Sequence, residues 1–243
     1  MPRALWRLMH AATHSLHGLL IVLLHFPALP VAARHRRIAW WSAKLLRCLG
    51  LELRFSGSFK PGAKLIVANH VSWLDIIAIH SVCPQARFVS KAEVRAWPLL
   101  ARLVDSASTL YIQRENRRDA LRVVHRMAEA MIAGDTVAVF PEGTTGSGPA
   151  PLPFHANLLQ AAIAVGAPVQ AVALRYADPG RRFSPAAAWV GDTTLLDSLW
   201  ALARSDGLVV HLDVIALLAT AHADRRALAL RLRALIGERL GEQ

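Results

Sequence analysis

Residues 64–75 read KLIVANHVSWLD, which is a mostly apolar run followed by a short polar turn. A second apolar run begins at Leu74, at the end of this stretch. The first run, Lys64–Ala68, has the length and β-branched content of a buried strand. The second run predicts a helix over about residues 74–81. A strand that passes through a short turn into a helix is the repeating unit of α/β proteins.

The same alternation continues along the chain from residue 52. Further strands are predicted near residues 87–90, 109–113, 136–140, 168–174 and 208–215, and helices near residues 98–104, 116–133, 157–165 and 223–240. Short connections between alternating elements predict an α/β fold, with a mostly parallel central sheet flanked by helices. Functional groups of such sheets gather at the carboxyl ends of the strands, so loops 69–75, 113–116 and 141–148 are expected to carry the chemistry.

The composition limits the classes to which the chain can belong. It has 243 residues, of which 54% are hydrophobic, and 28 Lys plus Arg against 17 Asp plus Glu give a net charge of +11. These values suit one domain of ordinary to large size and exclude disorder, collagen and coiled coil. Two cysteines, Cys48 and Cys83, make neither a disulfide framework nor a zinc cage. A mean hydropathy of +0.33 with a pI near 11.1 predicts an apolar and anionic partner, such as a phospholipid membrane.

The positive charge is concentrated in residues 1–51, because no acidic residue precedes Glu52. This segment contains Arg3, Arg7, Arg34, Arg36, Arg37, Lys44 and Arg47, with Trp6, Trp40 and Trp41. Tryptophan settles at the headgroup level of a bilayer. Nucleic acid would also attract the charge, but a nucleic-acid arm is normally polar between its cations and this segment is rich in leucine. We therefore expect an anionic phospholipid membrane as a partner, and no nucleic acid.

Residues 11–26 form an apolar stretch of 16 residues, about 24 Å long as a helix. Crossing a bilayer takes about 20 residues, so an interfacial or re-entrant anchor fits better than a span. A signal peptide is the alternative, since Pro30–Ala33 resembles a weak cleavage site, but the basic cluster that follows disfavours export. We expect a membrane-anchoring helical segment of residues 1–51, attached to a catalytic domain of residues 52–243.

Three histidines in this segment, His10, His14 and His17, recur at helical spacing and could form a metal-binding face. No carboxylate or cysteine lies near them in the sequence, so we favour a polar stripe on an amphipathic helix. The expectation is a protein without a metal site.

The turn after the first strand contains Asn69, His70 and Asp75. His70 and Asp75 would lie about 140° apart on an ideal helix. They can meet only if His70 lies on the turn and Asp75 reaches back from the first helical turn. Asp75 would then accept the Nδ1–H of His70 and leave Nε2 as a base. The alternative is that Asp75 merely favours the helix N-terminus and His70 is an ordinary loop residue.

Two further strand ends contain candidate binding groups. Arg114 suits bidentate capture of a phosphate, although it could equally be a solvated charge beside Arg117 and Arg118. Residues 140–148 read FPEGTTGSG, whose glycines let backbone N–H groups approach an anion. Glu142 in this loop could hold hydroxyl groups, pair with Arg114, or be an exposed acid on a turn.

Taken together, these blocks resemble the glycerolipid (lysophospholipid) acyltransferase family, typified by 1-acyl-glycerol-3-phosphate acyltransferase. The Asn-His-x4-Asp block matches at Asn69, His70 and Asp75, and the aromatic-Ile-x-Arg block matches at residues 111–114. The Phe-Pro-Glu-Gly-Thr block is intact at residues 140–144. The order and separation of the blocks over residues 69–172 make the resemblance specific.

Two positions depart from the family pattern. The last block is of Val-Pro-Val-x-Pro type, and this chain has Ala171 in place of its second proline. Many members follow Glu-Gly-Thr with Arg, where this chain has Thr145, so one phosphate-directed charge is missing. The reaction type is unaffected, but other lysolipids, such as lyso-ornithine lipid, stay in consideration beside lysophosphatidic acid.

The resemblance implies transfer of a fatty acyl group from acyl-CoA or acyl-carrier protein to the free hydroxyl of a lysophospholipid, with 1-acyl-sn-glycerol-3-phosphate as the first acceptor to expect. It implies His70 and Asp75 as catalytic residues, no cofactor, and a peripheral or monotopic protein at the cytoplasmic face of the inner membrane. The substrate-binding residues that it implies are Asn69, Arg114, Phe140, Pro141, Glu142, Gly143 and Thr144. A non-catalytic lipid-binding protein of the same fold is the alternative, and the intact His70–Asp75 pair counts against it.

A covalent acyl-enzyme is disfavoured by where the nucleophiles lie. Cys48 is in the basic N-terminal segment, Cys83 is at a helix end, and Ser72 is only two residues from its would-be base. We expect direct attack by the acceptor oxygen, with His70 Nε2 taking its proton. The developing oxyanion needs backbone N–H donors, which the helix start beside His70 or the Gly143 turn could supply.

Overall fold

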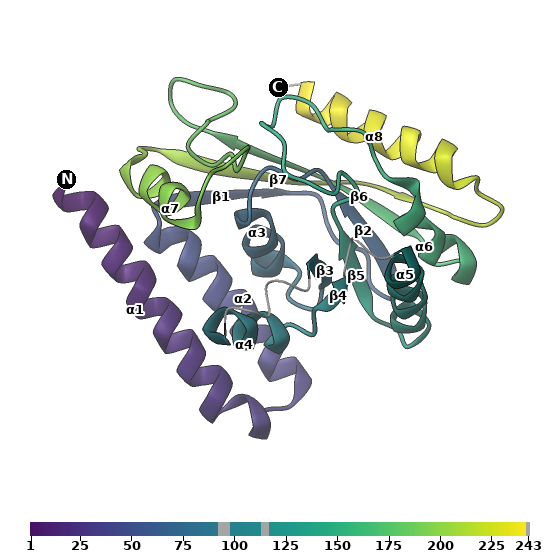
Figure 1. Cartoon of the computed structure of the whole chain (residues 1–243), viewed down its shortest axis with the longest axis horizontal. Coiled ribbons are helices and arrows are strands. Elements are labelled where there is room, and N and C mark those ends of the chain that lie inside the picture. The colour runs from purple at the N-terminus through teal and green to yellow at the C-terminus, as the bar shows by residue number, and fades with distance from the viewer. Residues whose placement is uncertain (92–97, 113–116, 242–243) are drawn as a thin grey trace.

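One seven-stranded sheet forms the centre of the molecule in the computed structural model, which describes residues 1–91, 98–112 and 117–241 (Figure 1). Its order is β1 (Leu51–Ser56), β7 (Leu208–Leu218), β6 (Val169–Ala177), β2 (Lys64–Ala68), β5 (Thr136–Val139), β3 (Arg87–Lys91) and β4 (Leu110–Ile112). All neighbouring strands are parallel except β6 and β7. Five strands therefore share one carboxyl edge, and the prediction of an α/β fold with a mostly parallel sheet is confirmed.

Helices cover both faces of this sheet. They are α1 (Pro2–Leu24), α2 (Val31–Cys48), α3 (Leu74–Val82), α4 (Pro98–Ser106), α5 (Arg117–Ile132), α6 (Gln160–Val165), α7 (Leu195–Arg204) and α8 (Arg225–Gly241), with short 3-10 turns at Phe26–Ala28 and Ala156–Leu159. One face packs against α2, α3 and α7, and the other packs against α5, α6 and α8. Helix α1 packs outside α2 and contacts α4 and α7.

The central strand β2 shows why the sheet needs two layers of helices. All five of its residues are buried. Ile66 and Ala68 pack toward α2, α3 and α7, whereas Leu65 and Val67 pack toward α5, α6 and α8. Successive side chains of a strand point to opposite faces, so a strand that is apolar at every position from Leu65 to Ala68 requires cover on both sides. This double cover fixes the carboxyl end of β2.

Two elements were not predicted from the sequence, β1 and α7. Strand β1 alternates apolar and polar residues at the edge of the sheet, and most of its residues are partly or fully exposed. Helix α7 begins with a capping box, in which Thr194 Oγ1 accepts the Asp197 N–H at 3.2 Å and Asp197 Oδ2 accepts the Thr194 N–H at 3.1 Å. Strand β6 also continues to Ala177, beyond its predicted end near residue 174.

Helices α1 and α2 form a hairpin that is fixed by polar contacts. Arg7 on α1 donates to two backbone carbonyls at the end of α7, at 2.6 and 3.2 Å. His14 Nε2 donates to the Trp41 carbonyl at 3.0 Å, and Trp41 Nε1 donates to the His14 carbonyl at 3.2 Å. Gly18 allows this close approach, since a Cβ there would lie 2.1 Å from Trp41 Nε1. The hairpin is therefore docked on the sheet domain through specific contacts.

The outer side of α1 carries exposed apolar side chains. They are Leu5, Trp6, Met9, Leu16, Leu20, Leu23 and Leu24, each more than 40% exposed. Among the residues described, no helix has both the length and the apolar content to cross a bilayer. Helix α1 is thus amphipathic, with an apolar side that the described part of the chain leaves open to its surroundings.

Candidate active site

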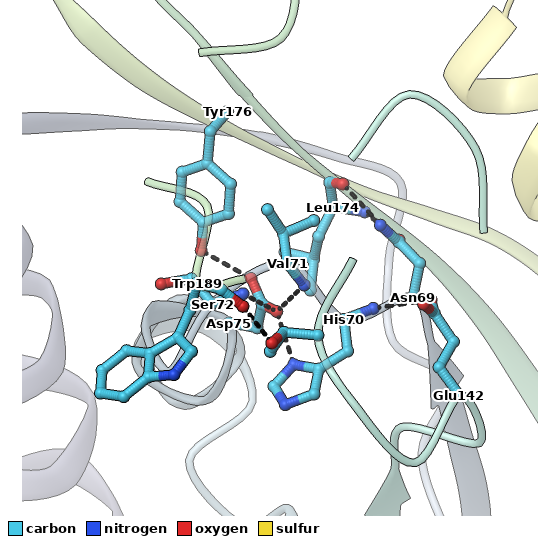
Figure 2. A network of polar contacts seen from close by, with 10 residues as sticks. Asn69, His70, Val71, Ser72, Asp75, Glu142, Leu174, Tyr176 and Trp189 are labelled. Carbon is cyan, nitrogen blue, oxygen red and sulfur yellow. Dashed lines mark hydrogen bonds and ion pairs between the residues drawn. The ribbon is translucent and has the colours of Figure 1, made fainter. Parts of the chain in front are cut away.

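A side-chain amide fixes the turn between β2 and α3 to the neighbouring strand β6. Asn69 Nδ2 donates to the Leu174 carbonyl at 2.9 Å, and Asn69 Oδ1 accepts the Leu174 N–H at 2.8 Å (Figure 2). These bonds continue the pairing of β2 with β6 beyond the end of β2. His70, the next residue, is therefore held at the carboxyl edge of the sheet.

His70 and Asp75 meet across this turn. The imidazole Nδ1 lies 2.8 Å from Asp75 Oδ2, and the same oxygen accepts the N–H groups of Val71 at 2.7 Å and Ser72 at 2.9 Å. Asp75 is fully buried in the first turn of α3. A carboxylate oxygen that accepts two N–H groups has no proton to offer, so Nδ1 carries the imidazole hydrogen and Nε2 carries the lone pair. The two side chains converge as the sequence predicted.

Three backbone amides near His70 donate within the protein. The amides of Val71 and Ser72 are the first two after His70, and both donate to Asp75. The Gly143 N–H donates to the Phe140 carbonyl at 3.2 Å. These three amides therefore stabilise the two turns of the site, and an oxyanion contact from the start of α3 at Leu74 stays a prediction.

Tyr176 is a further hydrogen-bond donor to Asp75, and it was not predicted from the sequence. Its hydroxyl donates to Asp75 Oδ1 at 2.7 Å from strand β6 (Figure 2). Burial, and next the charge of Asp75, raise the pKa of Tyr176 well above its ordinary value, so the phenol stays a donor. The available signal was a tyrosine within an otherwise apolar strand, two residues after Leu174, whose backbone bonds Asn69.

Phe140 packs against the face of the His70 ring. The two rings are stacked, with centroids 4.0 Å apart and planes 7° apart, and Phe88 stacks behind Phe140. The His70 side chain is 19% exposed, whereas Asp75 is fully enclosed. The imidazole is thus fixed by a carboxylate at Nδ1 and by an aromatic face, with Nε2 on the side of the ring away from Asp75.

Glu142 points into the protein rather than out from the turn. Its Oε1 accepts the His70 N–H at 2.9 Å, and its carboxylate also accepts the Leu152 N–H. Burial raises the pKa of Glu142, and these two backbone N–H groups partly oppose that rise. The alternative of an exposed acid is therefore wrong. Pro141 is also buried, and its carbonyl accepts the His155 N–H at 2.8 Å.

The rest of the loop after β5 closes over the turn that carries His70. The Gly146 N–H donates to the His70 carbonyl at 2.7 Å. Gly143 has a φ of +72°, which favours glycine, and a Cβ there would lie 3.1 Å from the His155 ring. Thr144 is exposed at the surface of the loop. The two predicted motifs therefore form one hydrogen-bonded unit.

Arg114, the candidate residue for binding the head group, lies outside the described residues.

Three possible nucleophiles, Ser72, Cys83 and Cys48, are poorly suited to attack a thioester. Ser72 is fully buried, with no hydrogen-bond partner for its Oγ in the described structure. Burial raises the pKa of Cys83 to about 11 and also raises that of Cys48. Because thiolates and exposed hydroxyls are the effective nucleophiles, these groups are poorly suited to form an acyl-enzyme.

The geometry defines a general-base site at the carboxyl edge of a parallel sheet. The family described as Acyltransferase matches residues 53–175, which include β2, the His70–Asp75 turn and the loop after β5. This chain belongs to that acyltransferase family, and its resemblance to glycerolipid acyltransferases is confirmed.

Two relatives show which enzymes are similar to this chain. It is 39% identical over 196 residues to the lyso-ornithine lipid O-acyltransferase of Pseudomonas aeruginosa, covering 81% of this chain and 75% of that protein. It is 39% identical over 180 residues to the 1-acyl-sn-glycerol-3-phosphate acyltransferase of Neisseria meningitidis, covering 73% and 69%. The relatives are thus lysolipid acyltransferases with two different acceptors.

The fold also matches a solved structure. The 1-acyl-sn-glycerophosphate acyltransferase PlsC from Thermotoga maritima superposes with a TM-score of 0.68 over 97% of both chains, at 19% sequence identity. The likeness covers the N-terminal hairpin as well as the sheet domain, and it supports the architecture described above.

Proposed function

We propose that this protein moves a fatty acyl group from a thioester, acyl-CoA or acyl-carrier protein, to the free hydroxyl of a lysolipid. His70 Nε2 takes the hydroxyl proton as the oxygen attacks the thioester carbonyl. The C–O bond forms, the C–S bond breaks, and the donor leaves as a thiolate. The contact of 2.8 Å between His70 Nδ1 and Asp75 carries the proposal, because it leaves Nε2 as the basic nitrogen.

Asp75 assists His70 in this scheme, and other residues bind the acceptor. Asp75 orients the ring and stabilises the imidazolium that forms after proton transfer. A general base of this kind accelerates a reaction by about 10²–10⁴-fold. A free thiol has a pKa of about 8.5, so the departing thiolate needs little acid assistance. Arg114 and the loop of residues 141–144 would bind the head group of the acceptor, with Thr144 at its exposed surface.

The first acceptor that we propose is 1-acyl-sn-glycerol-3-phosphate, which would give phosphatidic acid. The second is lyso-ornithine lipid, and residue 145 favours it. Thr145 stands where many members of the family have an arginine, and its hydroxyl donates to the Trp189 carbonyl. This position therefore offers the acceptor no cation for a phosphate, which a lysolipid without a phosphate does not need.

An acyl-transfer assay tests the proposal. Purified full-length protein would be given one labelled acyl-CoA, or the acyl-carrier protein thioester, with each of the two lysolipids. We expect transfer to at least one of them, and loss of at least a hundredfold in kcat for His70→Ala with the fold retained. His155→Ala, which changes an imidazole on the same loop unit, is the matched control and should keep most of the activity. Full turnover by His70→Ala would remove His70 as the base.

We further propose that α1 lies in the membrane interface, with residues 1–51 as the membrane-associated part of the protein, at the cytoplasmic face of the inner membrane. The exposed apolar side of α1 supports this, because insertion into the headgroup region would cover it. The excess of basic residues in the same segment would attract anionic lipid.

Co-sedimentation with phosphatidylglycerol vesicles tests the membrane proposal. Leu24→Ser removes an α1 side chain that is 70% exposed, and Leu230→Ser removes one on α8 that is 68% exposed. The two helices lie on opposite faces of the sheet. We expect Leu24→Ser to weaken vesicle binding and Leu230→Ser to leave it nearly unchanged. Equal effects of the two variants would contradict insertion through α1.

A further inference from the structure

A cavity of about 510 Å³ lies at the edge of the sheet opposite His70. Lys64, Arg87 and Thr136 line it, and they are the first residues of β2, β3 and β5. The first turns of α2 close its other side. At about 3.3 Å per residue, β2 puts roughly 16 Å between Lys64 and Asn69. The cavity is therefore separate from the acyl-transfer site.

The lining of this cavity is basic. It includes the cations Arg34, Lys64 and Arg87 and the single carboxylate Asp135 among the described lining residues. Asp135 forms an ion pair with Arg87, at the side of the cavity where β3 and β5 begin. His35 also lines it, but burial lowers the pKa of its imidazole, so we count it as neutral. The lining thus has two more positive charges than negative charges.

Lys64 is the least expected of these cations, because it is only 1% exposed. Its ammonium donates to the Gly62 carbonyl at 2.9 Å and to Thr136 Oγ1 at 3.1 Å, and both partners are neutral oxygens. An ammonium has three N–H donors, and these bonds account for two. A buried charge is unfavourable unless an opposite charge compensates it. An anion in the cavity would supply that charge.

The start of α2 and an adjoining apolar slot indicate which class of ligand the cavity would bind. Val31, the first residue of α2, lines the cavity, and no side chain caps this helix start, so its N–H groups favour an anion. Ile38, Ser106 and Ala107 line both the cavity and a narrow slot of about 60 Å³ between α1, α2 and α4. The slot also contains apolar groups such as Phe26. A phosphate that carries an aliphatic chain matches this combination.

We propose that the basic cavity is a phosphate-binding site, distinct from the acyl-transfer site, that holds the phosphate of an anionic lipid with part of its chain in the slot. Arg34 on α2 is the residue best placed to bind the phosphate, since it lines the cavity and is partly exposed. Among the described residues its guanidinium donates only from Nε, in a bond of 2.9 Å to the Leu29 carbonyl. Free inorganic phosphate shares the same chemistry and is the other source of such a ligand.

Titration calorimetry on the purified full-length protein tests this site with two probes, inorganic phosphate and dihexanoyl phosphatidylglycerol below its micelle concentration. Arg34→Gln is the test variant. Arg36→Gln is the matched control, because it removes the same charge two residues further along α2, at an exposed position that does not line the cavity. Arg34→Lys keeps the charge but removes the forked donor. Circular dichroism of each variant verifies the fold.

We expect Arg34→Gln to weaken binding by about tenfold to a hundredfold, as for a charge-assisted hydrogen bond, and Arg34→Lys to weaken it less. Arg36→Gln should change binding by less than about threefold. Arg34-dependent binding of phosphatidylglycerol alone would identify a lipid site, and equal Arg34 dependence with inorganic phosphate would identify a site for the phosphate group itself. The proposal fails if neither probe binds, or if Arg34→Gln and Arg36→Gln have the same effect. Neither result depends on acyl transfer.

Discussion

His70 lies just before helix α3 and His80 lies in its last turn, and the two imidazoles have different hydrogen-bond partners and different exposure. His70 precedes α3, bonds a buried carboxylate through Nδ1 and is partly exposed. His80 lies in the last turn of α3 and is 6% exposed. Its Nε2–H donates to the Ala86 carbonyl at 2.9 Å, and its ring meets Phe88 edge to face. Burial lowers the pKa of His80 to about 4.

The difference shows what turns a histidine into a base. A carboxylate partner stabilises the imidazolium that forms during turnover, and partial exposure gives a substrate access to Nε2. Burial in apolar surroundings keeps the His80 ring neutral, although its hydrogen bond to the Ala86 carbonyl partly opposes this effect on the pKa. The four predictions below change one side of this contrast at a time.

Asp75→Asn should have the largest effect, because it removes the charge that distinguishes His70 from His80. The amide oxygen can still accept the N–H groups of Val71 and Ser72, so the fold should persist. We expect kcat to fall by about 10³–10⁴-fold, as in the comparable histidine–aspartate pair of serine proteases. Steady-state acyl-transfer kinetics measure it, with the melting temperature as the control. A loss of less than tenfold would be incompatible with the proposed role.

His80→Gln should alter stability in acid. The folded-state pKa of His80, about 4, is below the ordinary 6.5, so the unfolded chain binds a proton first as the pH falls. The wild type should therefore lose stability between about pH 6.5 and 4, by about 3 kcal/mol from this group. Glutamine can keep the donor to Ala86 without titrating. Urea unfolding across this range should show a shallower loss for the variant, and parallel curves would refute the assignment.

Tyr176→Phe tests whether Asp75 needs its fourth donor. Phenylalanine fills the same space but leaves Asp75 Oδ1 without the hydroxyl at 2.7 Å. Losing a hydrogen bond to a charged group is worth about 1.5–3 kcal/mol, so we expect kcat to fall about tenfold or more. KM should stay nearly constant, because Tyr176 acts through Asp75 and does not touch the substrate. A change in KM alone would assign Tyr176 to substrate binding instead.

Phe140→Leu should have the smallest effect. It keeps an apolar side chain but removes the ring stacked 4.0 Å from His70. Aromatic pairs contribute about 0.5–1.5 kcal/mol beyond burial, so kcat should fall by about two- to tenfold. Acyl-transfer kinetics at saturating acceptor measure this directly. An unchanged kcat would show that Asp75 alone orients the ring.

The turn between β2 and α3 could be predicted because its signals are local. A strand with four consecutive apolar residues, a polar turn and an acid in the first helical turn lie next to one another in the sequence. The direction of Glu142 could not be predicted, because its partner, the His70 N–H, is 72 residues away. Tyr176 was missed for the same reason, since its distance from Asp75 in the chain is 101 residues.

Strand β1 and helix α7 show a second kind of limit. Strand β1 pairs with β7, about 157 residues later, and its mixed polarity is typical of an edge that gains its order from the partner strand. Helix α7 had a local signal in the Thr194–Asp197 capping box, although a Thr-x-x-Asp spacing is weak on its own. Long-range pairing therefore explains why β1 was missed, whereas α7 was missed because its local signal is weak.

The tautomer of His70 tests the central claim most directly. Long-range proton–nitrogen NMR spectra of the ¹⁵N-histidine-labelled protein distinguish a protonated from an unprotonated ring nitrogen, and the His70→Gln variant identifies the signals of residue 70. At mildly alkaline pH we predict a protonated Nδ1 and an unprotonated Nε2. A proton found on Nε2, with Nδ1 bare, would contradict the proposal that Asp75 prepares His70 to act as the base.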